Sequence, residues 1–310
     1  MIKLISLTPK NSNMGNLMKM GSTISKKLST TISLVGLGVI LIGWYLITQF
    51  GNIPPSILPK PMSVLLSFEE LYTKYNIFSE AWYSIKLNFY GYMEAILISI
   101  PLGFFIGLFP FPKALLSSWV DSSRFLPLTA LMGLFVAWFG IEIGMKIHFL
   151  AFGIIIYILP IMVKRIDDVD KAHIQTAWTI GASDFQTFLY VYFPSVISKL
   201  FSDIKVIVAV SWSYIVVAEM MNAEGGVGSL IFRVTKQGRI DMVFAILILI
   251  VLIGIANDTI FTFLDKMLFP YNHESSQLKS RSGWRGVIAS IKEFAYKHLL
   301  KPSVSKQPQS

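Results

Sequence analysis

The sequence contains no cysteine and few charged residues. Of its 310 residues only 15% are charged, whereas 54% are hydrophobic and 14% are aromatic. Without cysteine the chain forms no disulfide and has no thiolate for a metal or a substrate. Soluble domains carry about 25% charged residues, so the composition excludes an ordinary soluble protein, and the aromatic content excludes an intrinsically disordered one. The mean hydropathy of +0.61 predicts a membrane protein.

Motifs that bind phosphate or metal are also missing. No Gly-Lys dipeptide occurs, so the chain has no Gly-x-x-x-x-Gly-Lys phosphate loop. The glycine-rich run Gly225–Gly228 lacks the lysine, and we expect it to be a flexible turn on the outer side. The four histidines are scattered without metal-ligand spacing. We therefore predict no catalytic residue, no metal and no cofactor bound by this chain.

Six apolar stretches are candidates for membrane-spanning helices, which need roughly 20 apolar residues each. They are Ile32–Phe50, Asn88–Phe109, Phe125–Phe139, Ile147–Val163, Lys205–Met221 and Met242–Leu264. The third and fourth are short, with a turn expected at 140–146. The first has no cleavage site after it, so we interpret it as a retained anchor. The predicted organisation is a basic segment at 1–31, an all-α bundle of six spans at 32–271 and a basic tail at 272–310.

The positive charges indicate the orientation. If the N-terminus is cytoplasmic, 19 of the 27 Lys and Arg residues fall in the inside segments, and 6 fall in the outside segments. Positive residues concentrate in cytoplasmic loops, so we expect both termini inside a cell or inner membrane. The net charge of +9 therefore reflects membrane orientation rather than nucleic-acid binding.

The tail beyond Tyr271 has an apolar stripe at helical spacing from Trp284 to Leu299, with basic residues between the apolar ones. This pattern favours a basic amphipathic helix on the membrane lipid of the inner leaflet. A solvated tail without structure and docking to a partner subunit are the alternatives.

A long connection separates the fourth and fifth spans, from Lys164 to Lys199, and long connections in a compact bundle are usually functional. Its first part has apolar or small residues at helical spacing until Gly181 interrupts, as a residue after a helix end would. Ser183 and Gln186 have the form of a capping box that starts a second short helix, which we expect Pro194 to close. The pattern fits either an amphipathic hairpin on the lipid headgroups or an element that docks into a groove of a soluble partner.

The residues of this loop resemble a known family. Ala177 to Ser183, followed by Phe193-Pro194, resembles the EAA loop of binding-protein-dependent ABC importer permeases. Other segments resemble motifs of the nitrate, sulfonate and taurine subfamily, in consistent order along the chain. These segments are Ile57–Pro61, Phe125–Leu131, Ala137–Ile141, Val217–Met220 and Gly225–Gly228. The chain departs from the family pattern where Gln175-Thr176-Ala177 stands for Glu-Ala-Ala and where Phe193 stands for leucine.

The resemblance implies a permease that forms the path for a small solute, such as nitrate, a sulfonate, taurine or bicarbonate. It implies separate ATPase subunits that bind ATP and Mg²⁺, an extracytoplasmic solute-binding protein and a second permease copy, giving a homodimer. The loop residues expected to couple to the ATPase are Gln175, Thr176, Ala177, Ile180, Gly181, Ala182, Ser183, Phe185, Phe193 and Pro194.

Ionisable residues in the spans are costly and suggest function. The candidates for a translocation path or for interhelical pairing are Lys86, Glu94, Glu219 and Asp258. The same residues leave open a stand-alone secondary transporter or channel that uses them as an ion relay. A membrane-embedded enzyme is disfavoured, because no clustered His, Cys or Asp motif is found.

Overall fold

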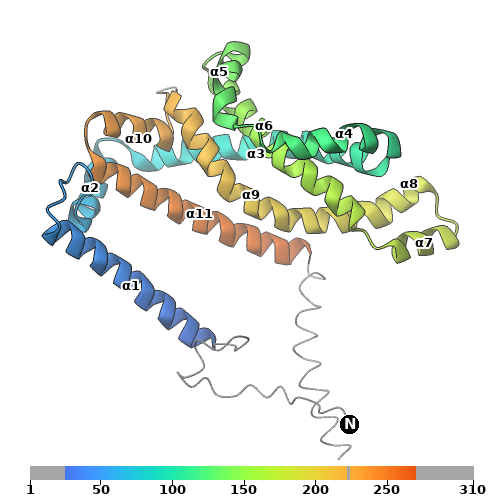
Figure 1. Ribbon diagram of the computed structural model, residues 1–310, viewed down its shortest axis with the longest axis horizontal. Helices are drawn as coiled ribbons and strands as arrows, with labels where there is room; N and C mark the ends of the chain where they lie inside the picture. Colours follow the sequence, from blue (N-terminus) through green and yellow to red (C-terminus); the bar gives the residue numbers. More distant parts are fainter. Residues whose placement is uncertain (1–24, 222–223, 270–310) are drawn as a thin grey trace, which may run out of the picture. The chain divides into compact units, whose positions relative to one another are not determined.

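The computed structural model describes residues 25–221 and 224–269, and every regular element within these ranges is helical (Figure 1). The all-α prediction is confirmed. The elements are α1 (Lys26–Phe50), α2 (Pro61–Thr73), α3 (Ile77–Leu108), α4 (Pro110–Ser123), α5 (Leu128–Phe139), α6 (Ile143–Asp167), α7 (Lys171–Thr179), α8 (Asp184–Thr187), the π-helix η2 (Phe188–Tyr192), α9 (Phe193–Met221), α10 (Val227–Lys236) and α11 (Ile240–Leu268). The predicted N-terminal segment up to residue 24 and the predicted tail from residue 272 lie outside the described residues.

Five helical segments are long and apolar enough to cross a membrane. They contain the predicted first, fourth, fifth and sixth spans, and they match the second, which was predicted to end at Phe109 and ends at Leu108. Each of the five begins earlier than the sequence suggested. The predicted third span at 125–139 does not form one long helix. It is represented by α5, whose 12 residues reach only about 18 Å of a hydrocarbon core about 30 Å thick. α4 and α5 together are long and apolar enough for a span, but a bend of 105° separates them, as in a broken span or a re-entrant loop.

The described residues form two compact units, which we describe separately. The first comprises residues 25–77 and 231–247. In it the Trp44 Nε1 donates a hydrogen bond to the Pro59 carbonyl at 3.0 Å, and the Trp44 ring stacks on Phe244 with centroids 5.8 Å apart. These contacts fix the Leu-Pro-Lys-Pro turn that leads into α2. Pro61 stands in the first turn of α2, where the backbone N–H groups have no helix partner, so its missing N–H costs no hydrogen bond.

An ion-pair cluster holds α2 to the segment before α11 in the same unit. The Arg239 guanidinium donates to Asp241 at 3.1 and 2.9 Å and to Glu70 at 2.8 Å. Lys74 donates to Glu70 at 2.8 Å. The hydrogen bonds from Lys74 and Arg239 lower the pKa of Glu70, and those to Asp241 and Glu70 raise the pKa of Arg239.

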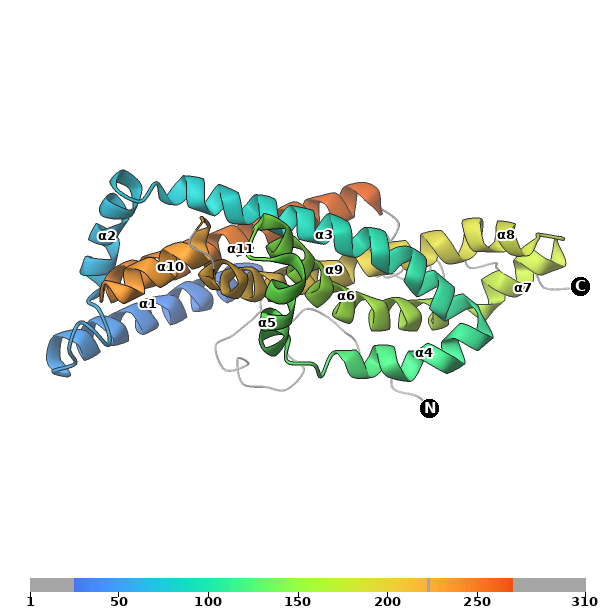
Figure 2. The ribbon, with the colours of Figure 1, turned by 90° about the horizontal axis from the view of Figure 1, so that it is seen from above.

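The second unit comprises residues 78–230 and 248–269, and its most extensive helix contact is between α6 and α9. α3 packs closely on α6 because it carries glycine where large α6 side chains approach. A Cβ at Gly103 would lie 2.9 Å from Met162, and one at Gly107 would lie 2.5 Å from Ile166. Small residues four apart allow this close approach in membrane helices. In Figure 2, α6 and α9 both run toward α7 and α8.

Candidate functional site

The turn after α7 is a Schellman motif built on Gly181. The Gly181 N–H donates to the Trp178 carbonyl at 3.0 Å, and the Ala182 N–H donates to the Ala177 carbonyl at 3.0 Å. Both bonds satisfy carbonyls that the end of the helix leaves without partners. Gly181 has φ +84°, a conformation that side chains with a Cβ rarely adopt. The interruption predicted at Gly181 is therefore confirmed.

The capping box predicted at Ser183 is also present. The Gln186 N–H donates to the Ser183 Oγ at 3.3 Å, and the Ser183 N–H donates to the Gln186 Oε1 at 2.8 Å. The prediction that Pro194 closes this helix is wrong. The run continues through η2 into α9 without a break, and together the three elements form 38 residues, Asp184–Met221.

The π-helix explains how the run passes Pro194. Proline has no N–H to donate, and its ring collides with the preceding turn of an α-helix. In η2 the Phe193 N–H donates to the Phe188 carbonyl, five residues back. This wider turn directly precedes the ring of Pro194 and makes room for it, so that the chain remains helical.

Large apolar side chains are exposed on this segment, which we call the α7–α8 segment (residues 171–192). Ile180 is 80% exposed, Phe185 70% and Trp178 55%. A groove of about 770 Å³ lies between the segment and the C-terminal end of α3. Its lining is mostly aromatic: Pro101, Phe104, Phe105, Leu108, Phe109, Trp178, Asp184, Phe185, Thr187, Phe188 and Tyr192. Exposed apolar surface of this kind can be covered by another protein or by lipid headgroups, the two alternatives that the sequence leaves open.

The remaining predicted loop residues support this surface. Ala177 is buried against the fold, whereas Gln175, Thr176, Ala182 and Ser183 are exposed or partly exposed. Thr176 donates its hydroxyl to the Ala172 carbonyl at 2.8 Å. Phe193 stacks on Phe104 of α3 at 5.9 Å, so the start of α9 is fixed against α3.

Ion pairs that the sequence did not indicate fasten the base of the α7–α8 segment. Arg165 of α6 donates two hydrogen bonds to the Asp203 carboxylate of α9, at 2.7 and 2.8 Å, and a third to Asp168 at 3.3 Å. Such a two-pronged arginine–carboxylate pair fixes orientation as well as distance. Lys113 of α4 pairs with Asp167 of α6. Because Arg165 and Asp203 are 38 residues apart, sequence spacing gave no sign of the pair.

Glu219, at the far end of α9, forms a second polar centre. Its side chain is fully buried and accepts hydrogen bonds from the Ser84 Oγ at 2.6 Å and the Gly228 N–H at 2.9 Å. Ser84 in turn accepts from the Val227 N–H at 2.9 Å. Gly226 donates to Glu80 at 2.6 Å. The expectation of a flexible turn at 225–228 is therefore wrong, because three of its N–H groups are held by α3 and α9.

Lys146 lies beside this carboxylate centre. The predicted turn at 140–146 ends earlier, since α6 begins at Ile143 and includes Lys146. The Lys146 side chain is fully buried, with its ammonium 5.5 Å from the centroid of the Tyr83 ring. Its Nζ has no hydrogen-bond partner within the part of the chain that the structure describes, but the charges of Glu219, Glu224 and Glu80 act on it. Lys146, Ser84 and Glu80 could not be linked to Glu219 from the sequence, because more than 70 residues separate each of them from it.

The other ionisable candidates do not converge on one site. Glu94 of α3 contacts the His148 Nδ1 of α6 at 2.8 Å. Asp258 of α11 pairs with Lys205 of α9 at 3.0 Å. Lys86 is exposed on α3. Within residues 25–221 and 224–269 no three His, Asp or Glu side chains are grouped closely enough to hold a metal ion.

The similarity of the chain to known proteins identifies its family. Residues 99–269, more than half of the chain, match the family described as the inner membrane component of binding-protein-dependent transport systems. The chain belongs to this family. It is therefore the permease subunit of an ABC importer, a membrane transport protein and not an enzyme. Permeases of this kind work with separate ATPase subunits and a binding protein, so the rival transporter and enzyme hypotheses are set aside.

Named relatives cover most of the permease. It is 25% identical over 249 residues to the taurine transport system permease protein TauC of Escherichia coli, which covers 79% of this chain and 90% of the relative. It is 24% identical over 235 residues to the putative aliphatic sulfonates transport permease protein SsuC of Bacillus subtilis, with 76% and 85% covered.

A solved structure shares the fold. The MetNI methionine ABC transporter in an inward-facing conformation matches with a TM-score of 0.56 and 16% identity, covering 62% of this chain and 95% of that chain. This likeness establishes the permease fold of the described helices and nothing about the solute.

Proposed function

We propose that this permease forms, as a homodimer, the translocation path for small organic anions of the aliphatic sulfonate class. The similarity to taurine and aliphatic sulfonate permeases supports the solute class. The excess of Lys and Arg in one set of loops supports a topology with both termini and the α7–α8 segment in the cytoplasm. ATP and Mg²⁺ are bound by the partner ATPase, in keeping with the missing phosphate loop.

The observation that carries the proposal is the unbroken helical run from α8 to the end of α9. A helix of 38 residues is about 57 Å long. One end bears the exposed Phe185, and the other bears the buried Glu219. An ATPase groove that grips the α7–α8 segment would therefore act on the same element that holds the carboxylate centre.

This connection supports a two-state mechanism. When ATP closes the ATPase subunits, they move the α7–α8 segment, and the rigid run displaces the far end of α9. Glu219 then changes its distance from Ser84 on α3 and from the turn at 226–228, so the outer end of the path opens or closes. Packed helices switch between discrete arrangements in this way.

Reconstitution tests the proposal. The permease is placed in liposomes with its ATPase and binding protein, and uptake of labelled 1-butanesulfonate is measured with and without ATP. We expect ATP-dependent uptake that requires the binding protein. Phe185→Ala should abolish both ATPase co-purification and uptake. Phe111→Ala, which removes an equally exposed phenylalanine on α4, is the matched control and should preserve both. Normal co-purification with Phe185→Ala would contradict the coupling role.

A further inference from the structure

Three buried hydrogen-bond donors that have no partner among the described residues face one cavity in the second unit. They are the Asn88 Nδ2 and the Tyr92 Oη of α3 and the Trp212 Nε1 of α9. Their side chains are only 6%, 7% and 5% exposed. The Ser211 hydroxyl lies within interaction range of the Tyr92 Oη, but within the described residues no hydrogen bond of good geometry is made to that oxygen. Buried donors are almost always hydrogen-bonded, and an unmade bond is costly.

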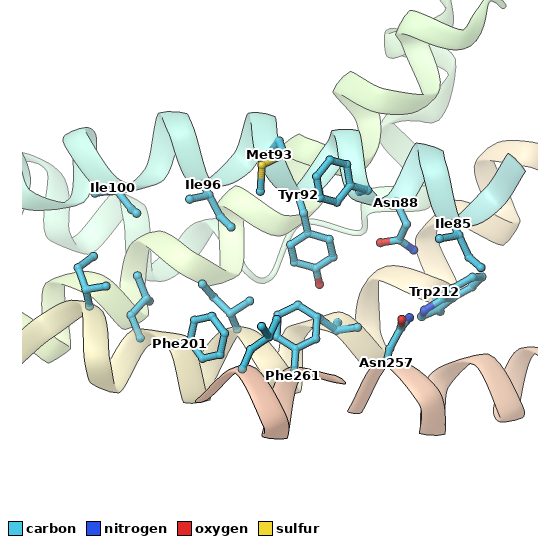
Figure 3. Close-up of a pocket in the computed structure, with 16 residues that line it drawn as sticks. Ile85, Asn88, Tyr92, Met93, Ile96, Ile100, Phe201, Trp212, Asn257 and Phe261 are labelled. Carbon is cyan, nitrogen blue, oxygen red and sulfur yellow. The ribbon is translucent and has the colours of Figure 1, made fainter. Parts of the chain in front are cut away.

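The cavity has a volume of about 470 Å³ and lies between α3, α9 and α11 (Figure 3). Among its sixteen lining residues, all in the described part of the chain, none is charged. Most are aliphatic or aromatic, including Ile96, Phe201 and Phe261. Figure 3 shows the Tyr92 hydroxyl pointing from α3 toward α9 and α11, with Asn88 and Trp212 beside the same space. A volume of this size is typical of small-molecule sites.

The chemistry of the free groups defines the ligand. The Asn88 Oδ1 already accepts a hydrogen bond from the Ser211 hydroxyl at 3.0 Å, so its amide hydrogens are what remains. The Trp212 N–H can only donate. The three buried groups therefore act as donors in an apolar cavity, whose fourth polar side chain is the Asn257 amide. The complement of the three donors is a head group that accepts hydrogen bonds, joined to an aliphatic body.

We propose that this cavity is a solute-binding site of the permease for unsubstituted alkanesulfonates. The three sulfonate oxygens accept from Asn88, Tyr92 and Trp212, and the alkyl chain packs on the aliphatic and aromatic wall. This inference rests on the proposed function and adds a selectivity to it. Taurine carries an ammonium group, for which the cavity lining offers no carboxylate, so taurine binds here more weakly than 1-butanesulfonate. A cavity that is filled only by bilayer acyl chains or by water would not bind 1-butanesulfonate more tightly than taurine.

Direct binding separates this inference from the proposed function. The permease–ATPase complex in nanodiscs, without the binding protein, is titrated with 1-butanesulfonate and with taurine. We expect 1-butanesulfonate to bind more tightly. Tyr92→Phe removes one charge-assisted hydrogen bond and should weaken its binding about 10- to 100-fold. Because no hydrogen bond of good geometry holds this hydroxyl within the described residues, Tm should change little. Tyr90→Phe, on the same helix but outside the cavity, is the matched control.

Two results would overturn the site. One is an unchanged affinity in Tyr92→Phe, which would leave water as the occupant of the donors. The other is no binding of 1-butanesulfonate, or binding no tighter than that of taurine. ATP-dependent uptake of 1-butanesulfonate in the reconstituted system would persist in either case, so the proposed function would stand. Loss of ATP-dependent uptake in the unaltered system would instead refute the proposed function.

Filling the cavity gives an independent readout. Ile96→Trp places a large ring among the lining residues and should block 1-butanesulfonate uptake while ATPase co-purification remains. Ile98→Trp adds the same ring to α3 outside the lining and should transport normally. Normal uptake with Ile96→Trp would show that transport does not need the cavity and would refute the inference.

Discussion

The two ends of the helical run from α8 to α9 are built in opposite ways. Near α8, Phe185 and Ile180 expose apolar surface and the polar bonds are local caps. At the end of α9, Glu219 is buried and bonded to residues of α3 and of the turn before α10. In the proposed function the first end is covered by the ATPase, whereas the second end is packed within this chain. Changes at the first should therefore impair assembly, and changes at the second should impair stability.

The glycines at the two ends show the same contrast. At Gly181 a Cβ would meet nothing within 4 Å, so only its φ of +84° requires glycine. At Gly226 φ is +97°, and a Cβ would lie 2.2 Å from the Glu219 carboxylate carbon. Gly228 would place a Cβ 2.2 Å from the Val216 carbonyl oxygen. The turn after α9 therefore needs glycine for space as well as for conformation.

The largest effect is expected for Gly226→Val. Its side chain would occupy the position of the Glu219 carboxylate and adopt an unfavourable φ, which together cost about 4 kcal/mol or more. The purified variant should aggregate on extraction or show a strongly lowered Tm in detergent. Gly254→Val, at an α11 glycine with open space around it, is the control and should retain a folded protein. A normal Tm for Gly226→Val would contradict the packing described here.

Glu219→Ala should follow in size. It leaves the Ser84 hydroxyl, the Gly228 N–H and the Lys146 ammonium without their carboxylate, at a cost of about 2–4 kcal/mol. Glu219→Gln retains an acceptor for Ser84 and should lose less. Thermal unfolding of the three proteins gives the order. Equal Tm values for Glu219→Ala and the unaltered permease would show that the buried carboxylate does not hold the turn.

Gly181→Ala should have a smaller effect. The added methyl group meets no neighbour, so only the left-handed conformation is penalised, by about 1–2 kcal/mol. Gly181→Asn should cost less, since asparagine tolerates this conformation. Tm measurements on both variants check the order. A loss as large as that of Gly226→Val would remove the distinction between the two glycines.

Ile180→Ser should have the smallest effect on stability, within about 0.5 kcal/mol, because the side chain is mostly exposed. ATPase co-purification should nevertheless fall. A lowered Tm together with normal ATPase binding would reverse the contrast between the two ends.

Local features of the fold could be read from the sequence, whereas the pairings between distant residues could not. Hydropathy locates the spans, and the cap at Ser183 and the stop at Gly181 depend on neighbours within a few residues. The helix end predicted at Pro194 was wrong, because the π-turn that accommodates the proline depends on backbone spacing rather than on residue type.

The polar centres could not be predicted from the sequence, because their residues are far apart along the chain. Ser84 meets Glu219 across 135 positions, and Asn88 meets Ser211 across 123. Only the packing of α3 against α9 makes these pairs. The three donors of the cavity are neutral residues in apolar stretches, so charge and hydropathy gave no signal for them.

The central claim is that the run from α8 to α9 transmits ATPase motion to the outer end. The natural absence of cysteine allows spin labels at Trp82→Cys on α3 and Met221→Cys at the end of α9, both exposed sites. Distances are measured by pulsed electron paramagnetic resonance in the full complex, without nucleotide and with trapped ATP. A shift of several ångströms that disappears with Phe185→Ala is predicted. An unchanged distance, or a shift that survives Phe185→Ala, would contradict the account.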